Sequence, residues 1–359
     1  MAFEEISLKI ESYLLRNTNF IVKKKKNKIS SKTRIIYYKT IKPKALANKN
    51  RLSKVNYTSG NFLIFIILIL IFDKQEQLLL SNDSYITLKI KSNCTINLFN
   101  PLKEREKCTQ LTLPNIIEFD ENNYTNITFD YPINFNTDQE KEIRLIWENN
   151  NEPKSTNCLF QDCSDITEID LSNFDSSHVT SMFRMFDNCS SLTSLNISNL
   201  NTSKVNRMQY MFCGCSSLNY LDLSNFDTSN VESMESLFNN CLSLVSLDIS
   251  SFNTSKVKNM RYTFYRCKSL SALDVSNFDT SNVETIAHMF EFCESLSFLN
   301  LSNFDTSKVT MMDWMFSGCS QLTELDISNF NSSNVVEFDG MFCYCSKLTS
   351  LNLSKFDTS

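Results

Sequence analysis

The sequence predicts an α/β repeat solenoid that follows a small β-rich cap, and two ladders of residues carry this prediction. A cysteine recurs every 26 residues from Cys163 to Cys345, and a phenylalanine recurs at the same step from Phe160 to Phe342. An unchanging period of this length is the signature of units that stack on one another. Because such an array grows by adding units, the length of 359 residues reflects repeat number rather than a number of globular domains.

Residues 1–60 form a basic tail that we expect to be disordered. They contain 15 Lys and Arg against 3 Asp and Glu, whereas the rest of the chain contains 20 against 37. The tail therefore has a formal charge of +12 and the remainder −17, although the whole chain has only −5. An acidic repeat region argues against a nucleic-acid partner, while the tail suits contact with phosphate or with an anionic membrane.

Residues 61–73 form a hydrophobic segment whose centre, residues 62–72, is an unbroken apolar run (FLIFIILILIF). As a helix, this run spans only about 16 Å at about 1.5 Å per residue, against about 30 Å of bilayer hydrocarbon. Its length suits a signal peptide or a signal anchor, cleaved or retained. A buried core strand or helix is the alternative. We expect export or membrane insertion, with membrane contact through this run and the basic tail.

Residues 74–156 are expected to form the β-rich cap. Apolar and polar residues alternate within residues 85–91, 126–130 and 142–147, which is typical of half-buried strands. A cap with a polar outer face is needed, because the first repeat would otherwise expose its apolar edge to water.

Residues 157–359 hold the repeats, and the unit that opens at Leu218 represents them all. Leu221 and Leu223 flank Asp222 in the pattern of a short strand, and the stacked strands are expected to form one parallel sheet. The second half of the unit spaces its apolar residues by three, four and three positions. This spacing predicts a short helix or irregular helical turns, with an apolar face formed by Val231, Met234, Phe238 and Cys241.

Smaller signals mark where the helical half should begin and end. Ser229 with Glu232 has the spacing of a capping box, as has Ser281 with Glu284. Gly214 and Gly318 each precede a ladder cysteine, where a closing turn makes a positive φ useful.

The last unit opens at Leu348 and stops at Ser359 without its second half, so we expect a truncated or fragmentary chain. The residue before the repeated Val alternates between Lys and Asn, which predicts pairs of 52 residues: Lys204, Asn230, Lys256, Asn282, Lys308 and Asn334.

The unit (L-x-x-L-x-L/I-S-N-F-D/N-T-S-x-V-x-x-M-x-x-M/L-F-x-x-C-x-S) resembles the 26-residue repeat of bacterial surface lipoproteins and of BspA-like leucine-rich-repeat surface proteins, over residues 157–359. The resemblance implies a leucine-rich-repeat-like right-handed stack and a non-enzymatic surface protein, linked in some members to adhesion. Two features depart from the family pattern. The cysteine that follows the apolar run is Cys94, too distant for a lipobox, and the tail of residues 1–60 has no counterpart.

The two ladders are interpreted as a structural core. One thiol per unit beside Phe and Met suits a buried free cysteine, while disulfides between neighbouring units or a metal site are the alternatives. We expect no metal and no cofactor. The predicted core ladder consists of Cys189, Cys215, Cys241, Cys267, Cys293, Cys319, Cys345, Phe186, Phe212, Phe238, Phe264, Phe290, Phe316 and Phe342. The better disulfide candidates lie off the ladder: Cys94, Cys108, Cys158, Cys213 and Cys343.

The outward strand positions form the predicted binding face. Carboxylates at one per unit could gather calcium, but a regular polar face of a solenoid more often binds proteins or glycans by area. The residues of this predicted face are Asp170, Asn196, Asp222, Asp248, Asp274, Asn300, Asp326 and Asn352.

Catalysis finds little support in the sequence. His178 and His288 occupy different positions of different units, and we interpret both as surface substitutions. We therefore expect a cell-surface or secreted protein that is not an enzyme and binds a protein or glycan partner. The alternative is an intracellular scaffold, in which residues 62–72 are core and the tail binds an acidic partner.

Overall fold

The computed structural model describes residues 83–91, 111, 113–119, 122–125, 140–148, 153–351, 353 and 356. All of them belong to one compact unit, Asn82–Ser359. The predictions for the tail and for the hydrophobic segment 61–73 fall outside the described residues. Among the residues described, no helix is long and apolar enough to cross a membrane.

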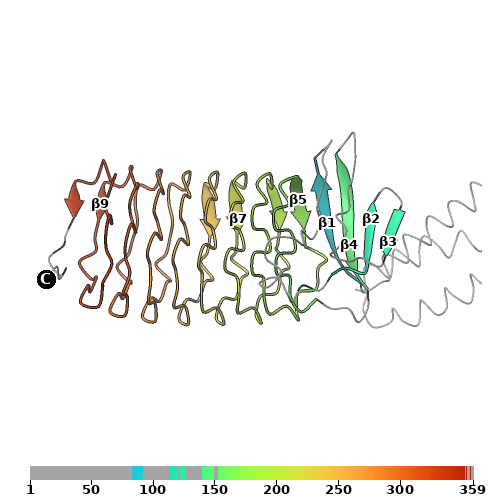
Figure 1. Cartoon of the computed structure of the whole chain (residues 1–359), viewed down its shortest axis with the longest axis horizontal. Helices are drawn as coiled ribbons and strands as arrows, with labels where there is room; N and C mark the ends of the chain where they lie inside the picture. The colour runs from blue at the N-terminus through green and yellow to red at the C-terminus, as the bar shows by residue number, and fades with distance from the viewer. Residues whose placement is uncertain are drawn as a thin grey trace, which may run out of the picture. The chain divides into compact units, whose positions relative to one another are not determined.

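A six-stranded sheet begins this unit, with the order β3-β2-β4-β1-β5-β6 (Figure 1). The pairs within β3-β2-β4-β1-β5 are antiparallel, and β5 and β6 are parallel. The strands are β1 (Ser84–Ile90), β2 (Ile116–Phe119), β3 (Asn122–Thr125), β4 (Lys141–Trp147), β5 (Ile166–Asp170) and β6 (Ser194–Asn196). Two of the segments predicted as strands coincide with β1 and β4, while residues 126–130 lie outside the described part.

The cap joins the repeats through this sheet, because β1 of the cap pairs with β5 of the first coil and Thr87 lies opposite Asp170. Side chains of a strand point alternately to opposite faces, so every second residue of β1 faces inward. Ile86, Leu88 and Ile90 are accordingly fully buried. Trp147 of β4 is also buried and meets Phe174 edge-on at 5.3 Å between ring centroids. The cap therefore covers the apolar end of the first repeat.

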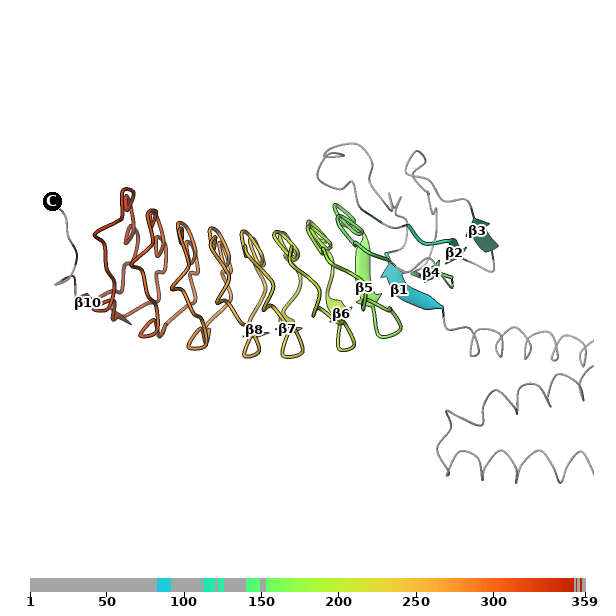
Figure 2. The same cartoon turned by 90° about the horizontal axis from the view of Figure 1, so that it is seen from below.

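From residue 154 onward the chain winds through 26-residue coils that lie side by side (Figures 1 and 2). The remaining strands are short and pair in parallel: β7 (Tyr220–Asp222) with β8 (Ser246–Asp248), and β9 (Glu324–Leu325) with β10 (Ser350–Leu351). The expected single parallel sheet is therefore wrong: the described strands belong to one mixed sheet and two two-stranded parallel sheets.

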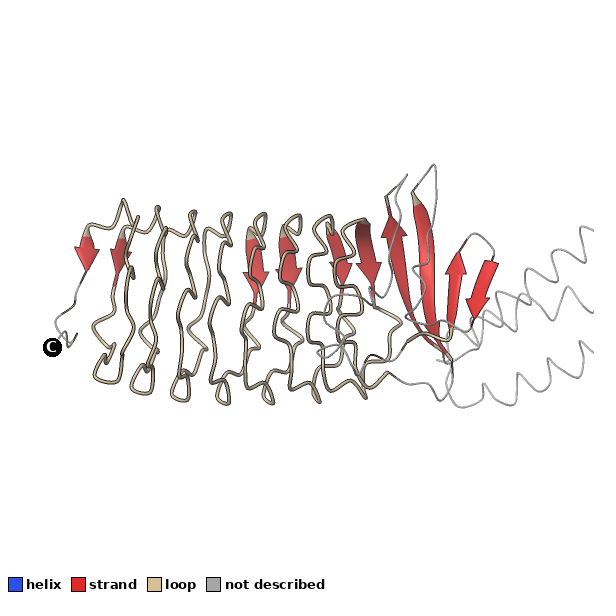
Figure 3. Cartoon of the chain, viewed as in Figure 1, coloured by secondary structure: helices blue, strands red, loops and turns tan. Residues whose placement is uncertain are grey.

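Strand bonding alternates from coil to coil, and Figure 3 shows the strands in pairs. Between the β7–β8 pair and the next pair, the Asn277 amide spans the junction and donates to the carbonyls of Ile249, Ser250 and Phe252. Asn225 and Asn329 make the same three-way contact at two other junctions. On this face the strand pairs therefore repeat every 52 residues, the period of the Lys and Asn alternation, whereas the bridges from Ser233 to Glu337 run through every coil. Within pairs, Lys256 donates to Asn230 and Lys308 donates to Asn282.

The predicted helical half of the unit is wrong, because no described residue is helical (Figure 3). Each coil instead makes successive turns: the N–H of Leu237 bonds the carbonyl of Met234, and the N–H of Phe238 then bonds Thr263 of the next coil. Successive N–H groups thus donate alternately to a carbonyl of the same coil and to a carbonyl of the next coil. Ser236 and Asn240, with φ of 55° and 60°, are left-handed and prevent a helix from forming.

Left-handed residues recur in two rows along the coils, and glycine occupies them where space is short. Gly214 and Gly318 have φ of 70° and 74°, which confirms the positive φ predicted for them. A Cβ added to Gly318 would lie 2.5 Å from the ring of Phe292, the residue at the same position one coil earlier. A larger side chain at Gly318 would therefore collide with Phe292, and only glycine adopts this left-handed conformation without added strain.

The core runs through the coils as a stack of rings. Phe212, Phe238 and Phe264 are fully buried and lie nearly parallel, with centroids 5.5–5.7 Å apart. Each coil thus buries its ring against the rings of the coils on both sides. At the last coil Phe342 is only half-buried.

Candidate functional site

The outward side of the strands, here called the sheet face, consists of two rows of side chains. In β7, Tyr220 and Asp222 are exposed on either side of the buried Leu221, and the same two positions recur every 26 residues. The first row is Glu168, Ser194, Tyr220, Ser246, Ala272, Phe298, Glu324 and Ser350. The second row contains the predicted binding residues Asp170, Asn196, Asp222, Asp248, Asp274, Asn300 and Asp326, while Asn352 lies outside the described residues.

Each described residue of the second row also accepts a hydrogen bond that shapes the turn after the strand, a role that the sequence did not reveal. One side-chain oxygen of Asp222 accepts the N–H of Ser224 at 2.9 Å, and Asp248 accepts that of Ser250 at 3.0 Å. This is an Asx turn, which bends the chain out of the strand. Hydrogen bonds from Ser224 lower the pKa of Asp222, so this exposed carboxylate is ionised at neutral pH.

Two large aromatic side chains stand out of the first row. Tyr220 is 56% exposed and Phe298 is 68% exposed, whereas the positions between them carry Ser246 and Ala272. Rings exposed to this degree on a folded surface are candidates for contact with a partner. Val245, beside this row, is also 55% exposed.

Two hollows lie on the sheet face, and both include residues of the second row. The first has a volume of about 280 Å³ and is lined in part by Lys89, Glu168 and Asp170. The second, of about 230 Å³, is lined in part by Asn196 and Tyr220. Both are open to solvent; the first is lined mainly by polar atoms and the second more by apolar atoms, which suits a partner's side chains rather than an enclosed small molecule.

The first hollow is closed at one end by ion pairs of the cap. The ammonium of Lys89 lies 2.5 Å from Glu168, and the guanidinium of Arg144 lies 3.5 Å from Glu142. Arg144 also lies 5.5 Å above the ring of Tyr85. Both cations are already paired with carboxylates, and with Asp170 the lining of this hollow carries more negative than positive charge.

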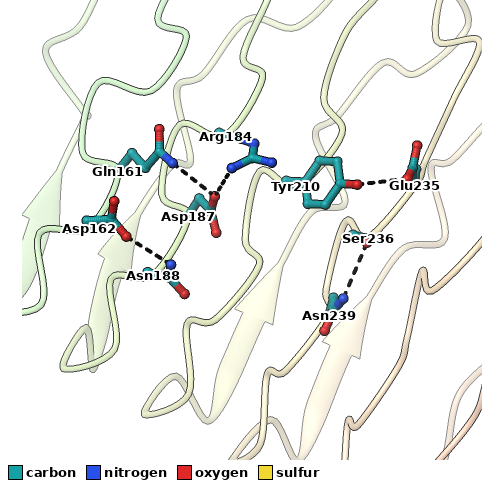
Figure 4. A network of polar contacts seen from close by, with 9 residues as sticks. All are labelled: Gln161, Asp162, Arg184, Asp187, Asn188, Tyr210, Glu235, Ser236 and Asn239. Carbon is teal, nitrogen blue, oxygen red and sulfur yellow. Dashed lines mark hydrogen bonds and ion pairs between the residues drawn. The ribbon is translucent and has the colours of Figure 1, made fainter. Parts of the chain in front are cut away.

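The opposite side of the coils, here called the turn face, carries a polar network (Figure 4). Arg184 lies 3.2 Å from the buried Asp187 and 4.6 Å from the ring centroid of Tyr210. The Tyr210 hydroxyl donates to Glu235 at 2.7 Å, and burial together with this bond raises the pKa of Tyr210 to about 12. These side chains bind one another across coils. The signal in the sequence is a row of mostly aromatic or charged residues at 26-residue spacing: Arg184, Tyr210, Ser236, Tyr262, His288 and Trp314.

His288 belongs to the turn face and is not the free surface substitution that the sequence predicted. One ring nitrogen lies 2.6 Å from Glu291 and the other lies 2.9 Å from Asp313, while the ring stacks on Tyr262 at 4.4 Å. Both nitrogens are therefore engaged by carboxylates. These contacts tie His288 to side chains of the same coil and of both neighbouring coils, so it is part of the network.

The ladder cysteines make a hydrogen bond that explains their position. The thiol of Cys241 donates to the carbonyl of Phe212 at 3.2 Å, and Cys267 donates to Phe238 at 3.3 Å, in each case 29 residues back. Burial raises the pKa of Cys241 to about 12, so its thiol stays protonated and weakly reactive. Cysteine is a small apolar side chain with one weak donor, so it suits a buried position beside a backbone carbonyl. In the described part of the chain, no group of three or more His, Cys, Asp or Glu could hold a metal ion.

The off-ladder cysteines divide into two groups. Cys158 is disulfide-bonded, as expected for a cysteine beside the cap. Cys213 and Cys343 are free, so the prediction that they form disulfides is wrong. Cys94 and Cys108 lie outside the described residues.

Comparison with known proteins places the coils in a family. A family model described as "Mycoplasma protein of unknown function, DUF285" matches residues 154–273 and 260–359. The two matches together span the coils and more than half of the chain. No curated protein and no solved structure matches the sequence.

Proposed function

Because the chain belongs to the family described as Mycoplasma protein of unknown function, DUF285, we propose a function from its own surfaces. It is a non-enzymatic recognition protein, at the cell surface or secreted, that binds proteins or glycans through the sheet face. At the finer level we propose a leucine-rich-repeat solenoid of the BspA-like class. The 26-residue period, the SNFDTS turn and the MF-x-x-C segment support this assignment.

One observation carries the proposal: exposed rings and two hollows lie on the same side of the coils. Tyr220 lines the second hollow and is exposed, and Phe298 stands in the same row three coils away. The turn face differs, because Arg184, Tyr210 and His288 are already engaged by neighbouring side chains. An extended face that presents exposed rings and carboxylates without an ion pair among the described residues suits recognition by area.

The cysteines support a location outside the cytoplasm. Cys158 is disulfide-bonded, and structural disulfides persist in oxidising compartments. The free ladder thiols agree with this, since Cys215 and Cys267 are fully buried and protected from oxidation. The apolar run of residues 62–72 suits export or anchoring.

Two measurements on the full chain test this function. Protease added to intact producing cells should digest the coils, because they lie outside the cell. The purified chain should bind members of a panel of matrix proteins and glycans, and Tyr220→Ser with Phe298→Ala should abolish that binding. Ser and Ala occur at these positions in other coils, so the double variant should fold normally. Full protection from protease, together with unchanged binding by the double variant, would contradict the proposal.

A further inference from the structure

The negative charge of the second row exceeds what the fold requires. Asn300 accepts the N–H of Ser302 at 3.1 Å, the bond that Asp274 makes with Ser276 at 2.9 Å. Since an amide oxygen completes this turn as well as a carboxylate does, the turn does not explain the charge.

Two of these charges face each other across paired strands, and a third follows in the next coil. Asp222 is directly opposite Asp248 in the β7–β8 pair, and Asp274 occupies the same position in the following coil. Neighbouring strands are about 4.8 Å apart, and like charges facing one another across strands are destabilising. A row of this kind opposes folding unless a cation covers it.

The described residues of the sheet face do not supply that cation. From Ser194 to Ser350, neither described row of the sheet face contains a Lys or Arg. None of the three carboxylates forms an ion pair with a residue that the structure describes. The nearby Lys268 pairs with Glu294 at 2.7 Å instead.

The exposed rings stand at the two ends of this acidic stretch. Tyr220 shares β7 with Asp222, and Phe298 lies one coil beyond Asp274. A ring face attracts an ammonium or guanidinium group, and a ring also covers the aliphatic stem of a Lys or Arg. Ser246 and Ala272 leave the space between the rings open for a chain to lie across the strands.

We propose that the sheet face between Tyr220 and Phe298 docks a Lys- or Arg-bearing segment of a polypeptide partner. The carboxylates of Asp222, Asp248 and Asp274 pair with its cations, and the two rings pack on its side chains. This inference rests on the proposed function and names the chemistry of the partner. A neutral glycan would leave the three charges unmatched, so the charge complementarity favours a basic polypeptide.

The test compares two triple variants of equal charge. Asp222→Asn, Asp248→Asn and Asp274→Asn remove the sheet-face charges and keep the turn bonds. The control, Asp227→Asn with Asp279→Asn and Asp305→Asn, removes three charges from exposed corners of the coils. At the same corner of other coils, the side chains of Asn201, Asn253 and Asn331 accept the same bond from the N–H two residues later. Both variants create Asn-x-Ser triplets, so a bacterial host without N-glycosylation is used.

The probes are labelled peptides in which Lys or Arg alternates with Ser, and an uncharged Gln-Ser peptide. At an ionic strength of about 0.15 M, the basic peptides should bind the full chain and the Gln-Ser peptide should not. Affinity should fall about tenfold or more in the sheet-face variant and less than about twofold in the corner variant. Equal losses in the two variants, or no loss in either, would overturn the inference.

The outcome separates this inference from the proposed function. If Tyr220→Ser with Phe298→Ala abolishes binding of a neutral glycan or protein while the sheet-face Asp variant binds normally, the sheet face binds partners but its partner is not basic. If neither the peptides nor the panel bind and protease leaves the coils intact on cells, the proposed function itself fails.

Discussion

A buried hydroxyl in each coil joins that coil to the next one. The Thr254 hydroxyl donates to the carbonyl of Asp279 at 2.9 Å and accepts its N–H at 2.8 Å. The sequence does not reveal this bond, because its partner lies 25 positions away and is not part of a turn motif. The buried row is Ser176, Thr202, Thr228, Thr254, Thr280 and Thr306.

Thr254→Val should destabilise the chain, because it leaves both backbone groups of Asp279 without their partner. We expect a loss of about 1–3 kcal/mol in the free energy of unfolding. Thr254→Ser keeps the hydroxyl, and serine occupies this position at Ser176 and Ser332, so it should lose much less. Urea denaturation of the two variants measures the difference, and equal stability would refute the hydroxyl bridge.

The thiols should differ in reactivity according to their position. Burial raises the pKa of Cys241 and of Cys293 to about 12, so neither is ionised in the folded chain. Cys343 is exposed and free. Alkylation of the native chain at about pH 8 should therefore modify Cys343 and leave the two ladder thiols unmodified. Mass spectrometry of the peptides reports each site, and rapid labelling of Cys241 would contradict the burial.

At the scale of the structural element, the unit shows why spacing alone predicted a helix. Met234, Phe238 and Cys241 return to one side after four and three residues in a helix, and a run of tight turns returns them in the same way. The choice depends on left-handed residues such as Ser236. Aromatic and charged residues rarely adopt that conformation, so the sequence does not reveal it. Glycine marks it in the sequence at Gly340 in the row of Ser236, and at Gly214 and Gly318 in the other row.

The strand half was easier to predict for a physical reason. Leu221 between Tyr220 and Asp222 has the alternation that only a strand produces, and burial follows it. The positions of the Asp222 row could be read in this way, but its turn bonds could not. The turn-face network was missed because Tyr210 and Glu235 meet only after the coils are stacked.

The asparagine junctions should contribute unequally to stability. Asn277 donates to three carbonyls between two coil pairs, whereas Asn303, within a pair, donates to the carbonyl of Ser276 alone. Asn277→Ala should therefore lose about 2 kcal/mol and Asn303→Ala about 1 kcal/mol or less. Denaturant melts of the two variants test this, and a larger loss from Asn303→Ala would show that the junctions between strand pairs are not the stronger contacts.

At the scale of the whole molecule, the polar corners make stability depend on pH. Hydrogen bonds from Ser229 lower the pKa of Asp227, and those from Ser307 lower the pKa of Asp305, from an ordinary value of 3.8. A lowered folded pKa means that the folded chain holds its protons less tightly than the unfolded chain does. The stabilisation is thus complete above the unfolded pKa and is lost as the pH falls through the folded one.

We therefore expect the free energy of unfolding to fall below about pH 4. Asp227→Asn with Asp305→Asn should flatten this dependence, because asparagine makes the same bond at Asn253 and does not titrate. Thermal melts across the acidic range measure both chains. Identical pH profiles would show that these corners do not contribute to acid sensitivity.

The central claim is that the sheet face, and not the turn face, contacts the partner. Hydroxyl-radical footprinting of the full chain, with and without the tightest binder from the panel, tests it directly because the reagent reports the exposure of each ring. Binding should protect Tyr220 and Phe298 and leave Tyr262 and Trp314 of the turn face unchanged. Protection of Tyr262 and Trp314, with Tyr220 and Phe298 still reactive, would contradict the account.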